Sequence, residues 1–179
     1  MSQRSESEFE PLPPRVDLRG RFLLAEPALA ETERLLPTYR GADGDHEGLV
    51  FLCGREIGST TLLCMAVAPE AAHGRGHVMA DQQAVGGVVA AARTLGLGVL
   101  AQVHSHPGAV THHSRGDDHM VLMPFEGMLS IVAPHYGHFG IRPLHGIGVH
   151  QFQDGRWRLA TENSIADNVT IIPGSLDLR

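Results

Sequence analysis

Apolar residues recur at helical spacing in two parts of the chain. Leucines and alanines repeat every three to four positions from Pro27 to Tyr39, which predicts an amphipathic helix that Pro37 shortens or kinks near its end. A longer helix is predicted after Asp81, whose carboxylate suits an N-cap, and it ends at Gly96. The apolar face of this second helix is expected to comprise Val85, Val88, Val89, Ala92 and Leu95.

Shorter runs of β-branched and apolar residues predict strands around these helices. The first strand follows Glu47 and runs to about Cys53, and the second covers Thr60–Val67, with a hairpin-like turn between them at residues 54–59. Another apolar run at residues 99–103 leads into two histidines, and a fourth strand is predicted at residues 129–132. Asp154-Gly155 is a favoured two-residue turn and predicts a final hairpin.

The remaining segments read as loops and tails. Residues 1–14 hold three acidic residues and three prolines and are expected to form a mobile tail, so the predicted domain covers residues 15–162, with a C-terminal extension at 163–179. The glycine- and histidine-rich segments 69–76 and 134–148 are expected to form either substrate walls or mobile surface loops. Ile171-Ile172-Pro173 is apolar enough to dock on this protomer, on a second copy or on a partner.

Composition narrows the class of protein. At 179 residues the chain fits a single domain, and its net charge of -6 argues against a general nucleic-acid or anionic-membrane surface and favours a protein partner. An apolar run long enough to span a membrane is absent, and the N-terminus lacks the apolar core of a signal peptide, which predicts a cytoplasmic protein. Cys53 and Cys64 lie in apolar runs and are expected to be buried small hydrophobic residues.

The segment that carries candidate chemistry begins at the end of the third predicted strand. Side chains alternate along a strand, so His104 and His106 point the same way, and Pro107 then ends the strand. Asp117 supplies a third ligand, and two nitrogens with one oxygen leave the fourth tetrahedral position of zinc open to water. This pattern predicts a catalytic zinc site rather than a closed structural one.

Each half of the pattern also has a plain structural explanation. One H-x-H pair can arise by chance in a chain with 12 histidines, and Ser114 with Asp117 is also the pattern of a helix N-cap. The neighbouring His112, His113 and Asp118 are interpreted as loop residues or as partners of the ligands, with Asp118 as a candidate to orient a ligand histidine. The spacing of the whole pattern, together with an upstream glutamate, favours the zinc site.

The complete set of residues resembles the JAMM, or MPN-plus, family of zinc metalloproteases, of the prokaryotic deubiquitinase-like type. The resembling residues are H-x-H-P at 104–107, S-x-x-D at 114–117, and a glutamate that precedes an apolar strand and lies seven residues before Gly54. The resemblance covers residues 22 to 159 approximately. It implies an α/β (α+β) fold, with a cytidine-deaminase-like JAB/MPN core in which a mixed central sheet is flanked by helices.

The resemblance also implies roles for individual residues. His104, His106 and Asp117 match the zinc ligands, Glu47 the general acid/base, and Ser114 the residue that steadies the tetrahedral intermediate. The implied activity is hydrolysis of the amide bond after the C-terminal glycine of a ubiquitin-like or sulfur-carrier protein, whose activating and conjugating enzymes are further candidate partners. A non-catalytic MPN-type scaffold and a zinc peptidase for small peptides are the alternatives.

Other hydrolase classes lack their signatures in this sequence. The environment of the two cysteines offers no means of lowering a thiol pKa, and the chain has no G-x-S-x-G nucleophile elbow. The zinc deaminase signature, H-x-E with a later P-C-x-x-C, is also absent. The sequence therefore favours a metalloprotease over a cysteine protease, a serine hydrolase or a nucleobase deaminase.

Overall fold

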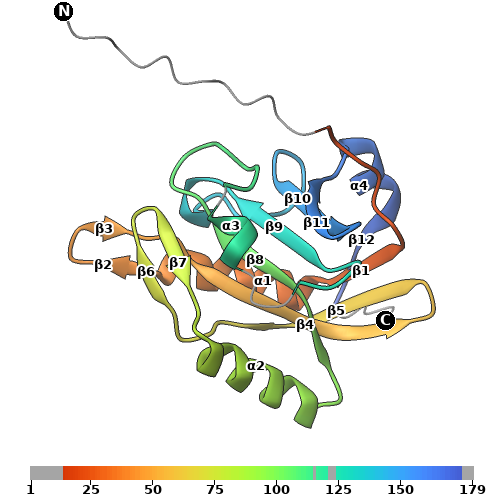
Figure 1. Cartoon of the computed structure of the whole chain (residues 1–179), viewed down its shortest axis with the longest axis horizontal. Coiled ribbons are helices and arrows are strands. Elements are labelled where there is room, and N and C mark those ends of the chain that lie inside the picture. The colour runs from red at the N-terminus through yellow and green to blue at the C-terminus, as the bar shows by residue number, and fades with distance from the viewer. Residues whose placement is uncertain (1–13, 115, 121–123, 175–179) are drawn as a thin grey trace, which may run out of the picture.

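The computed structural model describes residues 14–114, 116–120 and 124–174. These residues fold around a central eight-stranded sheet (Figure 1). The strands of this sheet lie in the order β11-β10-β9-β8-β4-β5-β1-β12. Their bounds are β1 Arg21–Ala25, β4 Leu49–Ile57, β5 Thr60–Val67, β8 Gly98–Ser105, β9 Leu129–Ala133, β10 Gly148–Gln153, β11 Arg156–Leu159 and β12 Val169–Ile172.

Four α-helices, two 3-10 helices and two small hairpins accompany the sheet in the described residues. The helices are α1 Glu26–Leu35, α2 Gln82–Thr94, α3 Asp117–Met120 and α4 Glu162–Asn168, with the 3-10 helices η1 Leu36–Thr38 and η2 His135–Gly137. One hairpin pairs β2 Arg40–Gly41 with β3 Gly44–Asp45, and the other pairs β6 Ala72–Gly74 with β7 His77–Met79. None of the helices in the described residues has the length and apolar character needed to cross a membrane.

The sheet is mixed, as the family resemblance implies. Strand β8 runs parallel to β9, and β1 runs parallel to both β5 and β12. The remaining neighbours are antiparallel, including β4 with β8 and β4 with β5. The α+β class with a mixed central sheet flanked by helices is therefore confirmed.

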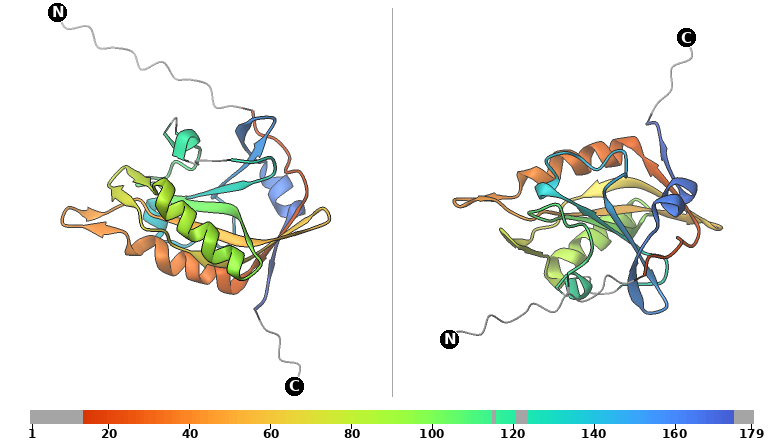
Figure 2. Two further views of the ribbon diagram at one scale, coloured as in Figure 1. Left: turned by 60° about the horizontal axis from the view of Figure 1, so that its bottom comes forward. Right: turned by 90° about the horizontal axis from the view of Figure 1, so that it is seen from above.

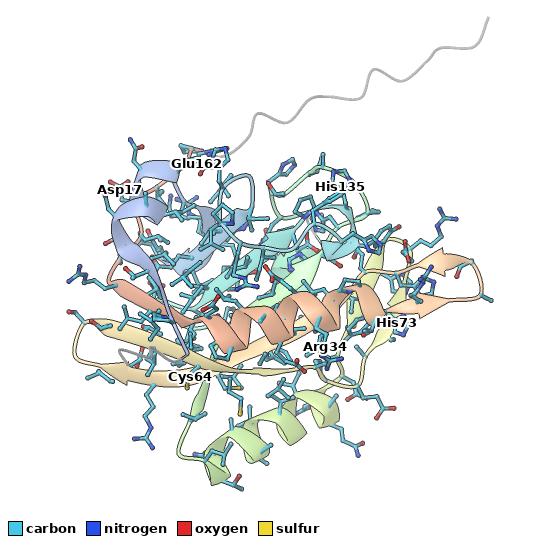
Figure 3. All side chains as sticks on the ribbon, turned by 180° about the vertical axis from the view of Figure 1, so that it is seen from behind. Asp17, Arg34, Cys64, His73, His135 and Glu162 are labelled. Atoms are coloured by element: carbon cyan, nitrogen blue, oxygen red, sulfur yellow. The ribbon has the colours of Figure 1, made fainter. Side chains whose placement is uncertain are left out.

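Strand β4 lies between two hydrophobic clusters because its side chains alternate between the two faces of the sheet. Val50 and Leu52 pack into the cluster that contains Leu29 of α1. Phe51 and Cys53 pack into the cluster that contains Val88 of α2. The two helices therefore cover opposite faces of the sheet (Figure 2), and Figure 3 shows α1, which carries Arg34, lying across one of them.

The exposed side of α2 differs from the prediction. Asp81 caps the helix by accepting a hydrogen bond from the amide of Ala84. Of the predicted apolar face, Val88 and Ala92 are buried and Val85 is half-buried, but Val89 and Leu95 are exposed. The helix lies at the edge of the molecule (Figure 1) and buries only Val88 and Ala92 against the sheet. Val89 is turned about 100° from Val88 around the helix axis and so faces away from the sheet.

Several local expectations are corrected by long-range pairing. The loop expected at residues 69–76 contains β6 and begins the β6–β7 hairpin. Cys64 is exposed rather than buried, because the β4–β5 register shifts there: Leu63 pairs with Gly54 and Met65 with Cys53, which leaves Cys64 at a bulge. Strand β1 was not predicted, and its partner β12 lies in the segment expected as a C-terminal extension. The apolar residues 171 and 172 thus dock on this protomer.

Candidate metal centre

The candidate site lies where the end of β8 meets the start of β4. In the antiparallel register, His104 lies opposite Leu49, and continuing that register by two residues brings Glu47 opposite His106. Ser105 fixes this junction, since its amide donates to the carbonyl of Gly48 at 3.1 Å and its hydroxyl accepts from the amide of Gly48 at 2.9 Å. The sheet itself therefore brings the predicted acid/base beside the predicted ligands.

Three side chains converge at this point with the geometry of a metal-binding group. The Nε2 atoms of His104 and His106 are 3.2 Å apart, and the carboxylate of Asp117 lies 3.6 Å from the first and 3.1 Å from the second. All three residues are buried, and one ligand atom of each lies within 4.8 Å of those of the others. Two imidazole nitrogens and a carboxylate oxygen are a donor set that suits zinc.

The orientation of His106 supports this fit. Its Nδ1 lies 2.9 Å from the carbonyl oxygen of Val110, to which it donates. That bond fixes the tautomer, so the lone pair of Nε2 points toward His104 and Asp117. His104 has a similarly directed Nε2, and its Nδ1 is buried with no hydrogen-bond partner among the described residues. The residues present therefore fit a divalent cation.

Asp117 and Ser114 hold one another across the start of α3. The amide of Ser114 donates to the Asp117 carboxylate, and the amide of Asp117 donates to the Ser114 hydroxyl at 3.3 Å. The capping interaction anticipated from the sequence is thus present. It coexists with the grouping of Asp117 and the histidines, because a carboxylate has lone pairs for more than one partner. Ser114 remains exposed and lines the same cavity as Glu47.

Burial and neighbouring charges perturb the ionisable groups of the site. Burial raises the pKa of Glu47 to about 7, and the charge of Asp117 adds to this while His106 opposes it. Burial also lowers the pKa of His104 to about 4. Burial opposes the charged forms of His106 and Asp117. The hydrogen bond with Asp117 nevertheless raises the pKa of His106, and hydrogen bonds with His104 and His106 hold the pKa of the Asp117 carboxyl far below its usual range.

A cavity of about 550 Å³ opens over Glu47, His106 and Asp117. One wall is the β6–β7 hairpin from Gly76 to Met79, and the other is the segment from Pro107 to His112. Met79 and Val110 stand at the rim and are 58% and 51% exposed. Only Gly76 of the loop expected at residues 69–76 lines the cavity, so the wall comes mainly from the strand that follows that loop.

The segment 134–148 supports the walls from outside the cavity. The amide of Tyr136 donates to the carbonyl of His106 at 2.7 Å, and its hydroxyl donates to the carbonyl of Arg75 at 3.0 Å. Tyr136 holds a φ of 56°, a conformation that a bulky residue rarely adopts. This residue therefore connects the end of β8 to the tip of the β6–β7 hairpin.

The other histidines of the loop have different roles from one another. His112 is half-buried and lines the cavity. Asp118 does not orient a ligand histidine, as the sequence suggested, because its carboxylate accepts from Nδ1 of His113 at 3.0 Å. Sequence reasoning also missed the contributions of Ser105, Val110 and Tyr136. The hydroxyl of Ser105 carried a weak signal between the two histidines, whereas backbone carbonyls carry none.

Comparisons with known proteins agree with this fold. The family model of prokaryotic homologs of the JAB domain matches residues 35–158. Similar solved structures include a Desulfitobacterium hafniense protein, with a TM-score of 0.62 at 13% identity over 85% of this chain and 93% of that one. Another is a JAB1/MPN domain protein from Archaeoglobus fulgidus, with a TM-score of 0.50 at 10% identity over 85% of this chain and 98% of that one.

No curated protein matches this chain. At such low identities the solved structures establish the fold and nothing finer. The family model, in contrast, covers more than half of the chain and includes Glu47, both histidines of the H-x-H pair, Ser114 and Asp117. The chain therefore belongs to the family of prokaryotic JAB-domain homologues.

Proposed function

We propose that this protein is a zinc-dependent isopeptidase or peptidase. Its substrate is a ubiquitin-like or sulfur-carrier protein, and it hydrolyses the amide bond that follows the C-terminal glycine of that protein. The reaction either releases a conjugated protein or matures a precursor. The activating and conjugating enzymes of the same ubiquitin-like protein are candidate partners.

One observation carries the proposal. A buried carboxyl group, Glu47, shares a cavity with two ligands of the candidate metal site, His106 and Asp117. A site that only stores or binds a metal has no use for an additional carboxyl group beside an open coordination position. A general acid/base with a pKa of about 7 is suited to proton transfer in both directions near neutral pH.

The chemistry follows from where the groups lie. His104, His106 and Asp117 would hold a zinc ion, which supplies Lewis-acid activation of water and of the scissile carbonyl. Glu47 accepts a proton from the attacking water and passes it to the departing amine. This second transfer is required because a lysine amine, with a free pKa of about 10.4, does not leave as an amide anion. The exposed hydroxyl of Ser114 donates to the carbonyl oxygen as negative charge develops there.

The shape of the cavity suits an extended glycine tail. Gly76 and Gly108 contribute backbone without side chains to the two walls. A substrate glycine likewise permits close approach of its own backbone. Apolar side chains at the rim, Met79 and Val110, offer contacts to residues that precede the terminal glycine.

The test uses fusions of ubiquitin-like and sulfur-carrier proteins to a reporter through the terminal glycine. The zinc-loaded protein should release the reporter, and a chelator should stop the release until zinc is restored. Glu47→Gln should bind zinc normally and lose activity by about 100-fold to 10,000-fold. Ser114→Ala should lose about 100-fold to 1,000-fold, because it removes one donor to the developing charge.

Three results would contradict the proposal. A purified protein without stoichiometric zinc and without cleavage would indicate a scaffold that binds ubiquitin-like proteins. Cleavage of short amides at rates equal to those for protein fusions would indicate a peptidase for small substrates. Full activity of Glu47→Gln would remove the carboxyl group from the mechanism.

A further inference from the structure

The sheet has a buried polar surface beside the candidate metal centre, on the face of the sheet that carries His104. Gln102 of β8, Ser130 of β9 and His150 of β10 lie opposite one another in the registers of these three strands. All three are buried, with exposed fractions of 3% or less. Their strand neighbours Ile131 and Val149 belong to the hydrophobic cluster on the other face. A buried polar row of this kind is costly unless its groups are hydrogen-bonded.

His113 supplies the bonds that satisfy much of this row. Its Nε2 lies 2.9 Å from the Ser130 hydroxyl, which also accepts from the side-chain amide of Gln102 at 3.0 Å. Its Nδ1 donates to Asp118 at 3.0 Å. The donors and acceptors are consistent along this chain, because a neutral imidazole accepts at one nitrogen while it donates from the other.

The ring of His113 is also tightly packed. It stacks on His150 with a centroid distance of 3.9 Å, and its backbone amide donates to Nε2 of His150 at 3.3 Å. The edge of Trp157 meets it at 5.4 Å, and the ring of the candidate ligand His104 lies 5.6 Å away. His113 is therefore held in one position by contacts with β8, β9, β10 and β11.

His113 immediately precedes Ser114 and lies four residues before Asp117. The two functional residues thus directly follow a residue whose side chain is hydrogen-bonded to the sheet. We propose that His113 is a positioning residue of the metal centre, which fastens the Ser114–Asp117 segment to the polar row of the sheet and so sets the place of the Asp117 carboxylate. The proposal rests on the metal-binding part of the proposed function and is independent of the substrate.

The substitutions separate the two hydrogen bonds of the ring. His113→Phe keeps an aromatic ring for the stack and removes both bonds. In His113→Gln the side-chain amide reaches the position of Nε2 and can restore the bond to Ser130. In His113→Asn the amide reaches only the position of Nδ1 and can restore the bond to Asp118. If attachment to the sheet is what matters, glutamine should rescue binding and asparagine should not.

Zinc affinity is measured by competition with a chelator, and the visible spectrum of the cobalt-substituted protein reports the ligand geometry. His113→Phe should weaken zinc binding by about 10-fold to 100-fold and change the cobalt spectrum, as loss of supporting hydrogen bonds does at other metal sites. His113→Gln should recover most of both. The matched control is His145→Phe, the same substitution at a histidine whose side chain is 86% exposed, and it should change neither.

Wild-type zinc affinity and cobalt spectrum in folded His113→Phe would overturn the proposal, and so would rescue by asparagine without rescue by glutamine. If the metal-free His113→Phe protein does not fold, the Ser130→Ala variant is used instead. This substitution removes the hydroxyl group on β9 that bonds to His113. That variant should bind zinc several-fold more weakly, and unchanged binding would overturn the proposal. Because no substrate is involved, failure to find isopeptidase activity leaves this result unaffected.

Discussion

At the scale of single residues, the site combines groups with opposite electrostatic demands. Glu47 is buried and favours its neutral form, whereas Asp117 is held ionised by the histidines beside it. Pairs of carboxyl groups whose environments separate their pKa values are typical of acid/base sites. The residue types and their spacing were readable from the sequence, but the direction of each pKa shift depends on burial and on contacts that only the fold creates.

Replacing Glu47 with glutamine should stabilise the metal-free protein although it lowers the proposed activity. The pKa of Glu47 is raised from 4.5 to about 7 in the folded state. Stability is therefore lost progressively as the pH rises from about 4.5 to about 7, and the loss is complete above pH 7. We expect Glu47→Gln to raise the free energy of unfolding by about 1–3 kcal/mol at pH 8 and to leave it unchanged below pH 4, where both states bind the proton. Denaturant unfolding at the two pH values measures this, and an equal effect at both would contradict it.

Zinc binding should release one proton between pH 5 and 6. The measurement uses the Glu47→Gln variant, so that the proton comes from a metal ligand and not from Glu47. His106 is protonated in this range because its pKa is raised above 6.5, whereas His104, with a pKa of about 4, is already neutral. A ligand imidazole must be deprotonated, so affinity should rise about tenfold per pH unit. Calorimetry in buffers of different ionisation enthalpy counts the protons, and a release of two would show that His104 titrates with its neighbour.

At the scale of elements, the site depends on the close contact between strand β10 and the loop at residues 107–112. Most helices and strands near the site follow from local pattern, because α2 and β8 carry a cap, a periodicity and an end signal within their own sequence. The contact between β10 and the segment 107–112 has no such signal. A Cβ atom at Gly148 would lie 1.7 Å from the carbonyl oxygen of Thr111, so a glycine is required there.

Gly148→Ala should therefore displace the loop that leads to Ser114 and Asp117. We expect a loss of about 1–3 kcal/mol in the free energy of unfolding and weaker zinc binding, because the backbone of Thr111 must move. The matched control is Gly87→Ala in α2, where an added Cβ meets nothing within 4 Å. That variant should gain about 0.5–1 kcal/mol with unchanged zinc affinity. Thermal unfolding and chelator competition on both variants test the pair, and equal stability changes would contradict it.

At the scale of the whole molecule, the two ends of the described chain meet in the sheet. Strand β1 lies between β5 and β12, and α4 packs Ile165 into the main hydrophobic cluster. This arrangement was not predicted, because β1 is only five residues long and its partners are distant in sequence. The segment from 163 onward is part of the fold up to the last described residue, 174, since β12 pairs with β1 along four residues.

A chain that ends at Asn168 should be less stable than the full protein by about 2 kcal/mol or more. It lacks β12, which removes the half-buried Val169 and Ile172 and exposes the backbone edge of β1. A chain that begins at Arg15 is the comparison, and it should unfold at the same temperature because residues 1–14 are predicted to be a tail. Calorimetry and size-exclusion chromatography measure stability and association, and equal unfolding temperatures for all three chains would contradict the prediction.

The sequence by itself determined the candidate metal ligands and the family of this protein, because ligand types, their spacing and strand alternation are local properties. His104 and His106 share a face through the two-residue repeat of a strand, and Asp117 follows at a fixed interval. Only the tertiary structure decided which groups meet. Strand register brings Glu47 close to His106, a backbone carbonyl of Val110 supports His106, and a hydrogen bond attaches His113 to Ser130. These contacts join segments that are separate in the sequence, so local sequence patterns do not predict them.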